Sequence, residues 1–278
     1  MERKKVTIQD LQAKKERREP FTMVTAYDYP TGVIVDKAGI DVILVGDSLA
    51  MVVLGLPNTV SVTMDEMLHH CRAVARGAKN PLLVGDMPFM SYQTGVADAV
   101  RNAGRFLKEA NMDVVKLEGG VKMAPVARAI VDAGIPVMGH IGLTPQTISA
   151  LGGFKVQGKD AAAAQQVVDD AVALQDAGCF AVVLEAIPDR VAKVITEKIG
   201  IPTIGIGAGP NCDAQVLVTH DMVGLFDRFV PKFVKRYTNI HDQMVTALQQ
   251  FKAEVEDHTF PGPEHCFTIK DDVLERLY

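Results

Sequence analysis

The stretch AGCFAVVLE (177–185) decides the fold, because it joins the end of a helix to an apolar strand through a glycine. The same order recurs as AGIDVILV (38–45), AGIPVMGH (133–140) and IGIPTIGIG (199–207). The glycines expected to end a helix in the left-handed conformation, which costs glycine least, are Gly39, Gly134, Gly178 and Gly200. The strand cores are rich in Val, Ile and Leu with little polar alternation, which is typical of parallel strands covered on both faces.

Helices and strands alternate along the chain. The clearest predicted helices span Met64–Arg76, Val96–Ala110, Ala124–Asp132, Ala161–Asp176 and Asp189–Lys198. The predicted strands span residues 21–27, 41–46, 82–86, 114–118, 136–140, 181–185, 202–206 and 233–236. Eight such units without a break in composition predict an α/β fold, a closed (β/α)8 TIM barrel that forms a single domain over residues 1–278. An open doubly wound sheet is the alternative.

Both ends of the chain extend the predicted barrel. Residues 1–20 are expected to form a short N-terminal helix, with Thr7 and Asp10 spaced as a capping pair and Pro20 ending the segment. Residues 268–278 form a C-terminal tail whose role the sequence leaves open.

Composition limits the partners of this chain. Its 278 residues are 48% hydrophobic, and its net charge of −5 gives no reason to expect nucleic acid or an anionic membrane as a partner. The four cysteines form no CxxC pair, which argues against a disulfide framework or a zinc cluster and fits a reducing cytosol. No apolar run is long enough to span a bilayer, and the charged start lacks the apolar core of a secretory signal. We therefore expect a cytoplasmic location.

Three carboxylates stand at the ends of neighbouring predicted strands: Asp47, Asp86 and Glu118. The carboxyl ends of parallel strands meet on one face, where barrel enzymes keep their chemistry. Converging anions repel unless a positive charge lies among them, and oxygen ligands select a hard ion, most simply Mg²⁺. Any one of them alone is more simply a helix cap, but three on successive strands favour a metal site.

Lys116, His140 and Glu185 complete this set of strand-end side chains. Lys116 lies two residues before Glu118 on a strand that reads as buried, where a lysine is costly unless it binds an anion. His140 alone is more often a structural group than a catalyst. Glu185 ends an apolar run, and a partly desolvated glutamate suits a general base, with a rim carboxylate as an equally good alternative.

Two long connections and one glycine-rich segment stand out. Residues 48–63 and 141–160 are expected to be lids or binding loops over the strand ends, because such loops are usually functional. The segment TIGIGAGPNCD (203–213) follows a strand position that often binds phosphate in barrels, but it lacks the spacing of a P-loop or a dinucleotide fingerprint.

An ordered set of motifs resembles the ketopantoate hydroxymethyltransferase family over nearly the whole chain. The motifs are TAYDYP (25–30), VGDSLAMVVLG (45–55), DMPFMSY (86–92), VKLEGG (115–120), GHIGLTPQ (139–146), GGFKVQGKD (152–160), LEAIP (184–188), IGIGAGPNCDAQVLVTHD (204–221), PKFVKRY (231–237) and PGPEHCF (261–267). The resemblance implies a barrel that uses Mg²⁺. It also implies transfer of a one-carbon unit from 5,10-methylenetetrahydrofolate to 3-methyl-2-oxobutanoate, giving 2-dehydropantoate for pantothenate synthesis. It implies a homo-oligomer, commonly a decamer.

The resemblance also implies roles for the strand-end residues. The metal ligands would be Asp47, Asp86 and, directly or through water, Glu118. The contacts to the oxo acid would come from Asp47, Ser48, Asp86, Lys116 and His140. Glu185 would accept the proton from C3, giving an enolate that Mg²⁺ stabilises. The chain departs from the family pattern at Ala50 and Ala214, where glycine is usual, and each change adds one methyl group.

Two other functions remain to be weighed. One is a Mg²⁺-dependent lyase or mutase of the isocitrate-lyase kind, whose Lys-Lys-Cys-Gly-His signature this sequence lacks. The other is an oxo-acid sensor without catalysis, which loss of Glu185 or Lys116 would indicate, although both are present.

Overall fold

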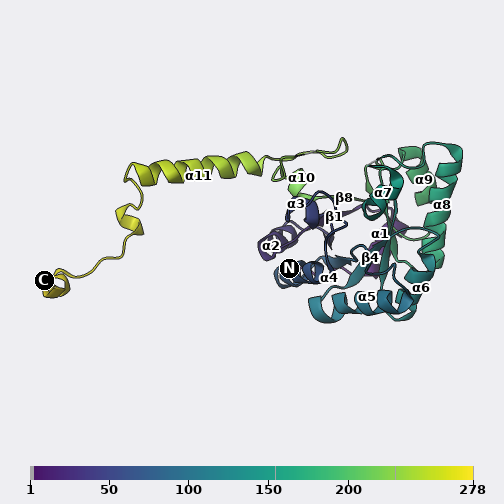
Figure 1. The fold of residues 1–278 in the computed structure, drawn as a ribbon, viewed down its shortest axis with the longest axis horizontal. Helices are drawn as coiled ribbons and strands as arrows, with labels where there is room; N and C mark the ends of the chain where they lie inside the picture. The colour runs from purple at the N-terminus through teal and green to yellow at the C-terminus, as the bar shows by residue number, and fades with distance from the viewer. Residues whose placement is uncertain (1–2, 154, 229, 278) are drawn as a thin grey trace.

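The computed structural model describes residues 3–153, 155–228 and 230–277, and it contains a closed barrel of eight parallel strands in sequence order (Figure 1). The strands are β1 (Phe21–Thr25), β2 (Val42–Val45), β3 (Leu82–Asp86), β4 (Val114–Glu118), β5 (Val137–Gly142), β6 (Ala181–Glu185), β7 (Thr203–Ile206) and β8 (Ala214–Leu217). The predicted (β/α)8 barrel is confirmed, and the open sheet is excluded. The first seven strands lie within two residues of their predicted bounds.

Most of the helices surround the barrel or lie in the connections between its strands. They are α1 (Ile8–Arg17), α2 (Tyr29–Lys37), α3 (Leu49–Val52), α4 (Met64–Gly77), α5 (Val96–Ala110), α6 (Ala124–Asp132), α7 (Ile148–Leu151), α8 (Ala161–Asp176), α9 (Asp189–Lys198), α10 (Thr219–Met222), α11 (Ile240–Glu256) and α12 (Asp271–Leu274). Short 3₁₀ turns span Pro145–Thr147, Pro263–His265 and Glu275–Leu277. The five helices that the sequence predicts are all present, and α1 begins at the predicted capping pair of Thr7 and Asp10.

Three of the four predicted helix-ending glycines are confirmed. Gly39, Gly134 and Gly178 have φ angles of 80°, 85° and 89°. Gly200 has no left-handed φ, so its prediction is wrong. The reason is local, since α9 ends in an extended Ile199 and needs no left-handed residue to turn into the next strand.

The prediction of the eighth strand at 233–236 is wrong. That segment is irregular and largely exposed, whereas β8 begins at Ala214 and pairs with β1 and β7. The prediction assumed a helix between the last two strands. Instead residues 207–213 return the chain directly, and Gly207 and Gly209, with φ of 63° and 77°, allow this tight path.

The barrel interior is an apolar core that α1 covers at its N-terminal end. Inward side chains from the strands form one cluster, and Leu11 of α1 joins it with no exposed surface.

At the same end of the barrel, two carboxylates hold the starts of the strands and bind α1. Asp41 and Asp213, each directly before a strand, accept backbone hydrogen bonds from β1 and β7 at 2.9 and 2.8 Å. Lys14 and Lys15 of α1 pair with these two carboxylates at 2.8 Å. The N-terminal helix is thereby fixed to the strand starts.

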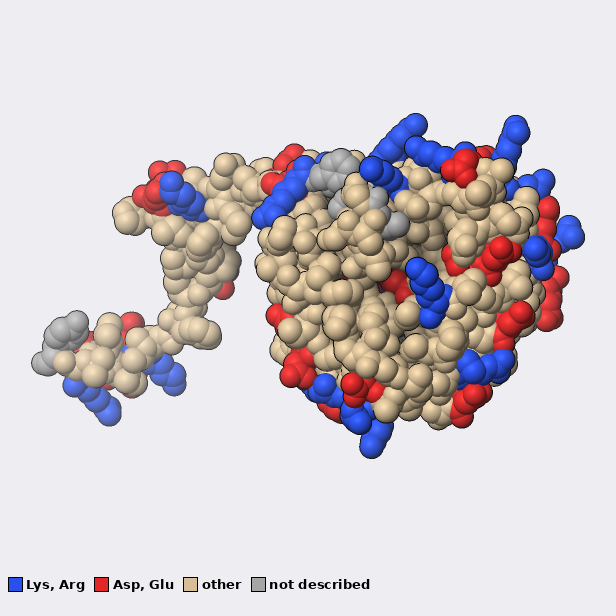
Figure 2. Space-filling model, turned by 45° about the vertical axis from the view of Figure 1, so that its right-hand side comes forward, with Lys and Arg blue, Asp and Glu red and all other residues tan. Residues whose placement is uncertain are grey.

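The chain leaves the barrel where α11 begins. Helix α11 projects away from the body and buries none of its residues (Figure 1). Figure 2 shows this arm as a separate projection, and it shows acidic and basic side chains interspersed over the barrel face. The prediction that residues 1–278 form a single domain therefore stays a prediction. No helix in the described part is long and apolar enough to cross a membrane.

We predict that Leu11→Ala lowers the free energy of unfolding by about 2–5 kcal/mol, because it removes a fully buried side chain from the base of the barrel. Urea unfolding measures the loss. Ile34→Ala is the control, since Ile34 is 65% exposed on α2 and should change the value little. Equal losses for the two variants would contradict the role assigned to α1.

Candidate active site

The polar side chains of the site continue the inward-facing rows of the barrel. On β3, Val84 faces the interior and Asp86 follows in the same row; on β4, Val114 faces the interior and Lys116 and Glu118 follow. The register sets Asp86 directly beside Lys116 on the next strand. These two strands therefore change from apolar to charged where they reach the carboxyl end.

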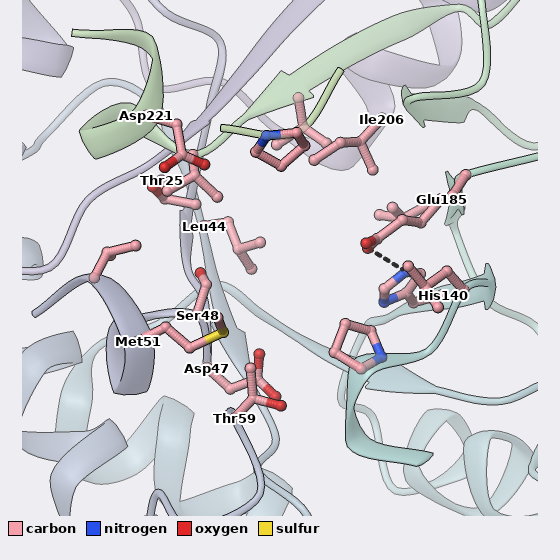
Figure 3. Close-up of a pocket in the computed structure, with 18 of the residues that line it drawn as sticks. Thr25, Leu44, Asp47, Ser48, Met51, Thr59, His140, Glu185, Ile206 and Asp221 are labelled. Atoms are coloured by element: carbon pink, nitrogen blue, oxygen red, sulfur yellow. Dashed lines mark ion pairs between the residues drawn. The ribbon is translucent and has the colours of Figure 1, made fainter. Parts of the chain in front are cut away.

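A cavity of about 570 Å³ opens at this end of the barrel (Figure 3). It is lined by all seven residues that the sequence singled out: Asp47, Ser48, Asp86, Lys116, Glu118, His140 and Glu185. All but Ser48 and Glu185 are at most 5% exposed. The structure thus brings the candidates together, while their chemical roles stay predictions.

The two long loops also line the cavity. The first, residues 48–63, holds α3 and contributes Met51 and Leu56. The second, residues 141–160, contributes Leu143 and contains the 3₁₀ turn Pro145–Thr147. Their apolar side chains cover the charged floor, as expected of loops that exclude water from a binding site.

Lys116 is the central cation of the site. Its ammonium lies 2.5 Å from Asp86 Oδ1, and both side chains are almost fully buried. Burial lowers the pKa of Lys116, but Asp86, Glu118 and Asp47 together outweigh this effect and raise it. The lysine is therefore charged at neutral pH, and its remaining N–H donors can serve a ligand.

Asp47 and Asp86 are crowded anions. Burial raises the pKa of Asp47 well above its usual value, and repulsion from Asp86 and Glu118 adds to the rise. Burial likewise raises the pKa of Asp86, although Lys116 partly offsets it. The backbone N–H of Asp47 donates to Asp86 Oδ2 at 3.1 Å, which holds the two residues side by side.

Gln146 ties the carboxylates together, and the sequence analysis did not single it out. Its side-chain amide donates to Asp47 Oδ2 at 3.0 Å, and its backbone N–H donates to Glu118 Oε2 at 3.0 Å. Tyr92 donates to the amide oxygen of Gln146 at 2.7 Å. Both residues lie within quoted motifs, DMPFMSY and GHIGLTPQ, but only the folded chain brings them to the carboxylates.

His140 lies between two glutamates. Its Nε2 is 3.1 Å from Glu185 Oε2 and its Nδ1 is 3.5 Å from Glu118 Oε1, although neither contact has the geometry of a hydrogen bond. Figure 3 shows the contact with Glu185 as a dashed line. Burial lowers the pKa of His140, but the two glutamates outweigh it and raise the pKa to about 9. A protonated imidazole therefore faces Glu185.

The backbone around Glu185 is tightly constrained. Gly142, beside it on β5, has a φ of 91°, and a Cβ there would lie 2.3 Å from the carbonyl oxygen of Glu185. Ala186, the next residue, has a φ of 48°, which is unfavourable for an L-residue. Its N–H donates to the carbonyl of Ile206 at 2.9 Å and holds that conformation. The end of β6 is therefore fixed in one orientation.

The donors of the cavity fit a hard divalent cation. Among the strand-end side chains, the four carboxylates of Asp47, Asp86, Glu118 and Glu185 lie with only two cationic groups, Lys116 and His140, so negative charge is in excess there. Within the described residues, no three His, Cys, Asp or Glu side chains already surround one point as metal ligands. Both oxygens of Asp86 accept hydrogen bonds, whereas no described residue donates to Asp47 Oδ1. This suits an ion such as Mg²⁺, which binds through one or two carboxylates and keeps several waters.

The fold is similar to those of solved enzymes of low sequence identity. Phosphonopyruvate hydrolase, solved with oxalate and Mg²⁺, has a TM-score of 0.61 at 13% identity, with 98% of this chain and 96% of that chain covered. A 2,3-dimethylmalate lyase of the PEP mutase/isocitrate lyase superfamily has a TM-score of 0.61 at 14% identity, with 98% and 91% covered. At such identities the likeness shows the fold alone.

The sequence relatives are much closer. The 3-methyl-2-oxobutanoate hydroxymethyltransferase of Syntrophomonas wolfei is 57% identical over 274 residues, which cover 99% of each chain. That of Enterococcus faecalis is 59% identical over 264 residues, 95% of this chain and 96% of the relative. The family model described as ketopantoate hydroxymethyltransferase matches residues 5–263. With identity this high over nearly its full length, the chain belongs to the ketopantoate hydroxymethyltransferase family of enzymes.

Proposed function

We propose that this enzyme transfers a hydroxymethyl unit from 5,10-methylenetetrahydrofolate to 3-methyl-2-oxobutanoate and forms 2-dehydropantoate. The relatives' names supply the oxo acid and the transferred group. The observation that carries the proposal is the buried pair of Lys116 and Asp86 in the same cavity as Glu185. A charged ammonium and a nearby carboxylate base together promote enolate formation at a 2-oxo acid, because one stabilises the developing oxyanion and the other accepts the proton.

The oxo acid would bind over the floor of the cavity. Ser48, whose hydroxyl lies 2.9 Å from that of Tyr27, can donate to the substrate carboxylate. Lys116 and the protonated His140 would face the keto oxygen, where negative charge grows as the enolate forms. Apolar loop residues above would exclude water and strengthen these interactions.

Glu185 would remove the proton from C3. The electron pair of the C3–H bond then moves toward the keto oxygen, and C3 becomes the nucleophile. A carbon–carbon bond forms between C3 and the methylene carbon of the donor as one of the two carbon–nitrogen bonds to that carbon breaks. One water then takes the place of the second nitrogen and supplies the hydroxyl group. The proton from C3 and one proton of the water go to the two nitrogens, and tetrahydrofolate leaves. The fixed backbone after Glu185 would keep its carboxylate aimed at the substrate.

Asp47 and Asp86 would hold Mg²⁺, with Glu118 in direct or water-mediated contact. When bound, such an ion polarises the keto group of a chelating 2-oxo acid and supplies positive charge near the developing enolate. Gln146 would position Asp47 and Glu118 for this contact through its two hydrogen bonds. A cytoplasmic location and a place in pantothenate synthesis belong to the same proposal.

Self-association through α11 is a further part of the proposal. Met244, Leu248, Phe251 and Val255 recur at helical spacing, and each is at least 43% exposed. Such an apolar stripe on a projecting helix favours a partner. The direct connection between β7 and β8 also leaves Gln215 of β8 exposed. A second copy of the chain could cover this side of the barrel.

We predict that Lys116→Ala slows product formation about 10²–10³-fold and weakens oxo-acid binding, because charge near the enolate oxygen is lost. Steady-state kinetics across an oxo-acid titration measures both effects. Lys122→Ala removes an exposed lysine just after the same strand and is the control. Unchanged kinetics in Lys116→Ala would remove this lysine from the mechanism.

Glu185→Gln should slow catalysis about 10²–10⁴-fold, because the amide keeps the shape but cannot accept the proton. Exchange of the substrate's C3 hydrogen in deuterated water, followed by NMR without folate, measures this step alone. Glu197→Gln, on the exposed face of α9, should exchange at the parent rate. If Glu185→Gln also does so, another group is the base.

Leu248→Glu should shift the protein to smaller species in sedimentation velocity, because it places a charge in the apolar stripe of α11. Gln243→Glu adds the same charge to this helix outside the four positions of the apolar stripe and should leave the sedimentation unchanged. Identical sedimentation of Leu248→Glu and the parent protein would exclude α11 as the contact.

A further inference from the structure

Asp221 is a buried carboxylate that the proposed steps do not use. It lies on α10, is only 7% exposed, and lines the same cavity as the strand-end residues. Figure 3 shows its carboxyl group on the wall across from His140 and Glu185. Burial raises its pKa to about 6, and Arg236 only partly offsets this. Within the described ranges, no group donates a hydrogen bond to it or forms an ion pair with it.

The backbone that carries Asp221 is fixed to the barrel. The N–H of Thr219 donates to the hydroxyl of Thr25 at 3.0 Å, and the hydroxyl of Thr219 donates to the carbonyl of Thr25 at 2.5 Å. These bonds join α10 to the end of β1. The carboxylate is therefore held in a set position although it has no partner of its own, which indicates that a ligand supplies the donors.

The surroundings of Asp221 define the shape and charge of such a ligand. Apolar side chains line the same cavity, among them Leu44, Val218 and Phe226. Lys155, Arg228 and Lys232 stand at the exposed rim of the same cavity. A ligand with a flat ring, N–H donors on one edge of the ring and an anionic tail fits these three features. The N–H donors would meet the carboxylate, the ring would lie between the apolar walls, and the tail would meet the basic rim.

We propose that Asp221 anchors the reduced pterin of the one-carbon donor by accepting hydrogen bonds from its ring N3–H and its 2-amino group. This proposal rests on the proposed function, which makes a tetrahydrofolate the donor. The pyrimidine edge is the side of the pterin away from the reactive nitrogen. Binding it on the wall opposite Glu185 would turn the one-carbon unit toward the oxo acid, and the rim cations would meet the glutamate tail.

The test compares Asp221→Asn with the matched control Asp227→Asn, an exposed aspartate in the same segment. The probe is tetrahydrofolate, titrated by calorimetry into the full-length protein. Asp221→Asn should raise its Kd about 10–10²-fold, because an amide presents an N–H where the ligand also presents N–H groups. Exchange of the C3 hydrogen without folate should stay within twofold of the parent rate, and Asp227→Asn should match the parent in both measurements.

A tetrahydrofolate analogue with a methyl group in place of the 2-amino group tests the contact itself. The parent protein should bind it about tenfold or more weakly than tetrahydrofolate, whereas Asp221→Asn should discriminate less between the two. Equal Kd values for tetrahydrofolate in parent and Asp221→Asn would overturn the anchor and leave the proposed function intact. A fall in kcat with unchanged Kd would likewise overturn it, in favour of a role in the chemistry. A parent protein that neither exchanges the C3 hydrogen nor binds tetrahydrofolate would reject the proposed function itself.

Discussion

The site depends on burying one lysine among carboxylates at the carboxyl end of the barrel. Lys116 and Asp86 are direct neighbours across two strands and lie almost entirely out of water. Breaking a buried pair by removing one partner leaves an uncompensated charge, which is strongly unfavourable. The pair alone does not balance the cavity, because Asp47 and Glu118 lie beside it. The remaining negative charge is what makes the floor suited to a divalent cation and a 2-oxo acid.

The barrel makes this arrangement possible by separating two functions along each strand. The lower part of every strand contributes to an apolar core that α1 covers, and ion pairs fix the helix to the strand starts. The upper parts of β3, β4, β5 and β6 carry the charged groups in the same inward rows. The rigid apolar part of the barrel thus holds the charged side chains at fixed distances from one another, which is the condition for electrostatic preorganisation.

Much of this was predictable, because the information lies in short segments. Apolar strands that end in Asp86, Glu118 or Glu185 identify both the barrel and the residues at its carboxyl end. The misplaced eighth strand has a different cause, since β8 is defined by its pairing with β1 nearly two hundred residues away. Gln146 was missed for the same reason: nothing in its local sequence indicates two carboxylates brought to it by other strands.

The most direct test of the account is whether Mg²⁺ and the oxo acid share one site. Calorimetric titration of Mg²⁺ into the protein, with and without 3-methyl-2-oxobutanoate, gives the coupling between them. The account predicts that the oxo acid tightens Mg²⁺ binding, that Mg²⁺ tightens oxo-acid binding by the same factor, and that Asp47→Asn removes this coupling. Independent binding of the two ligands, or full coupling in Asp47→Asn, would contradict the shared site on which the account depends.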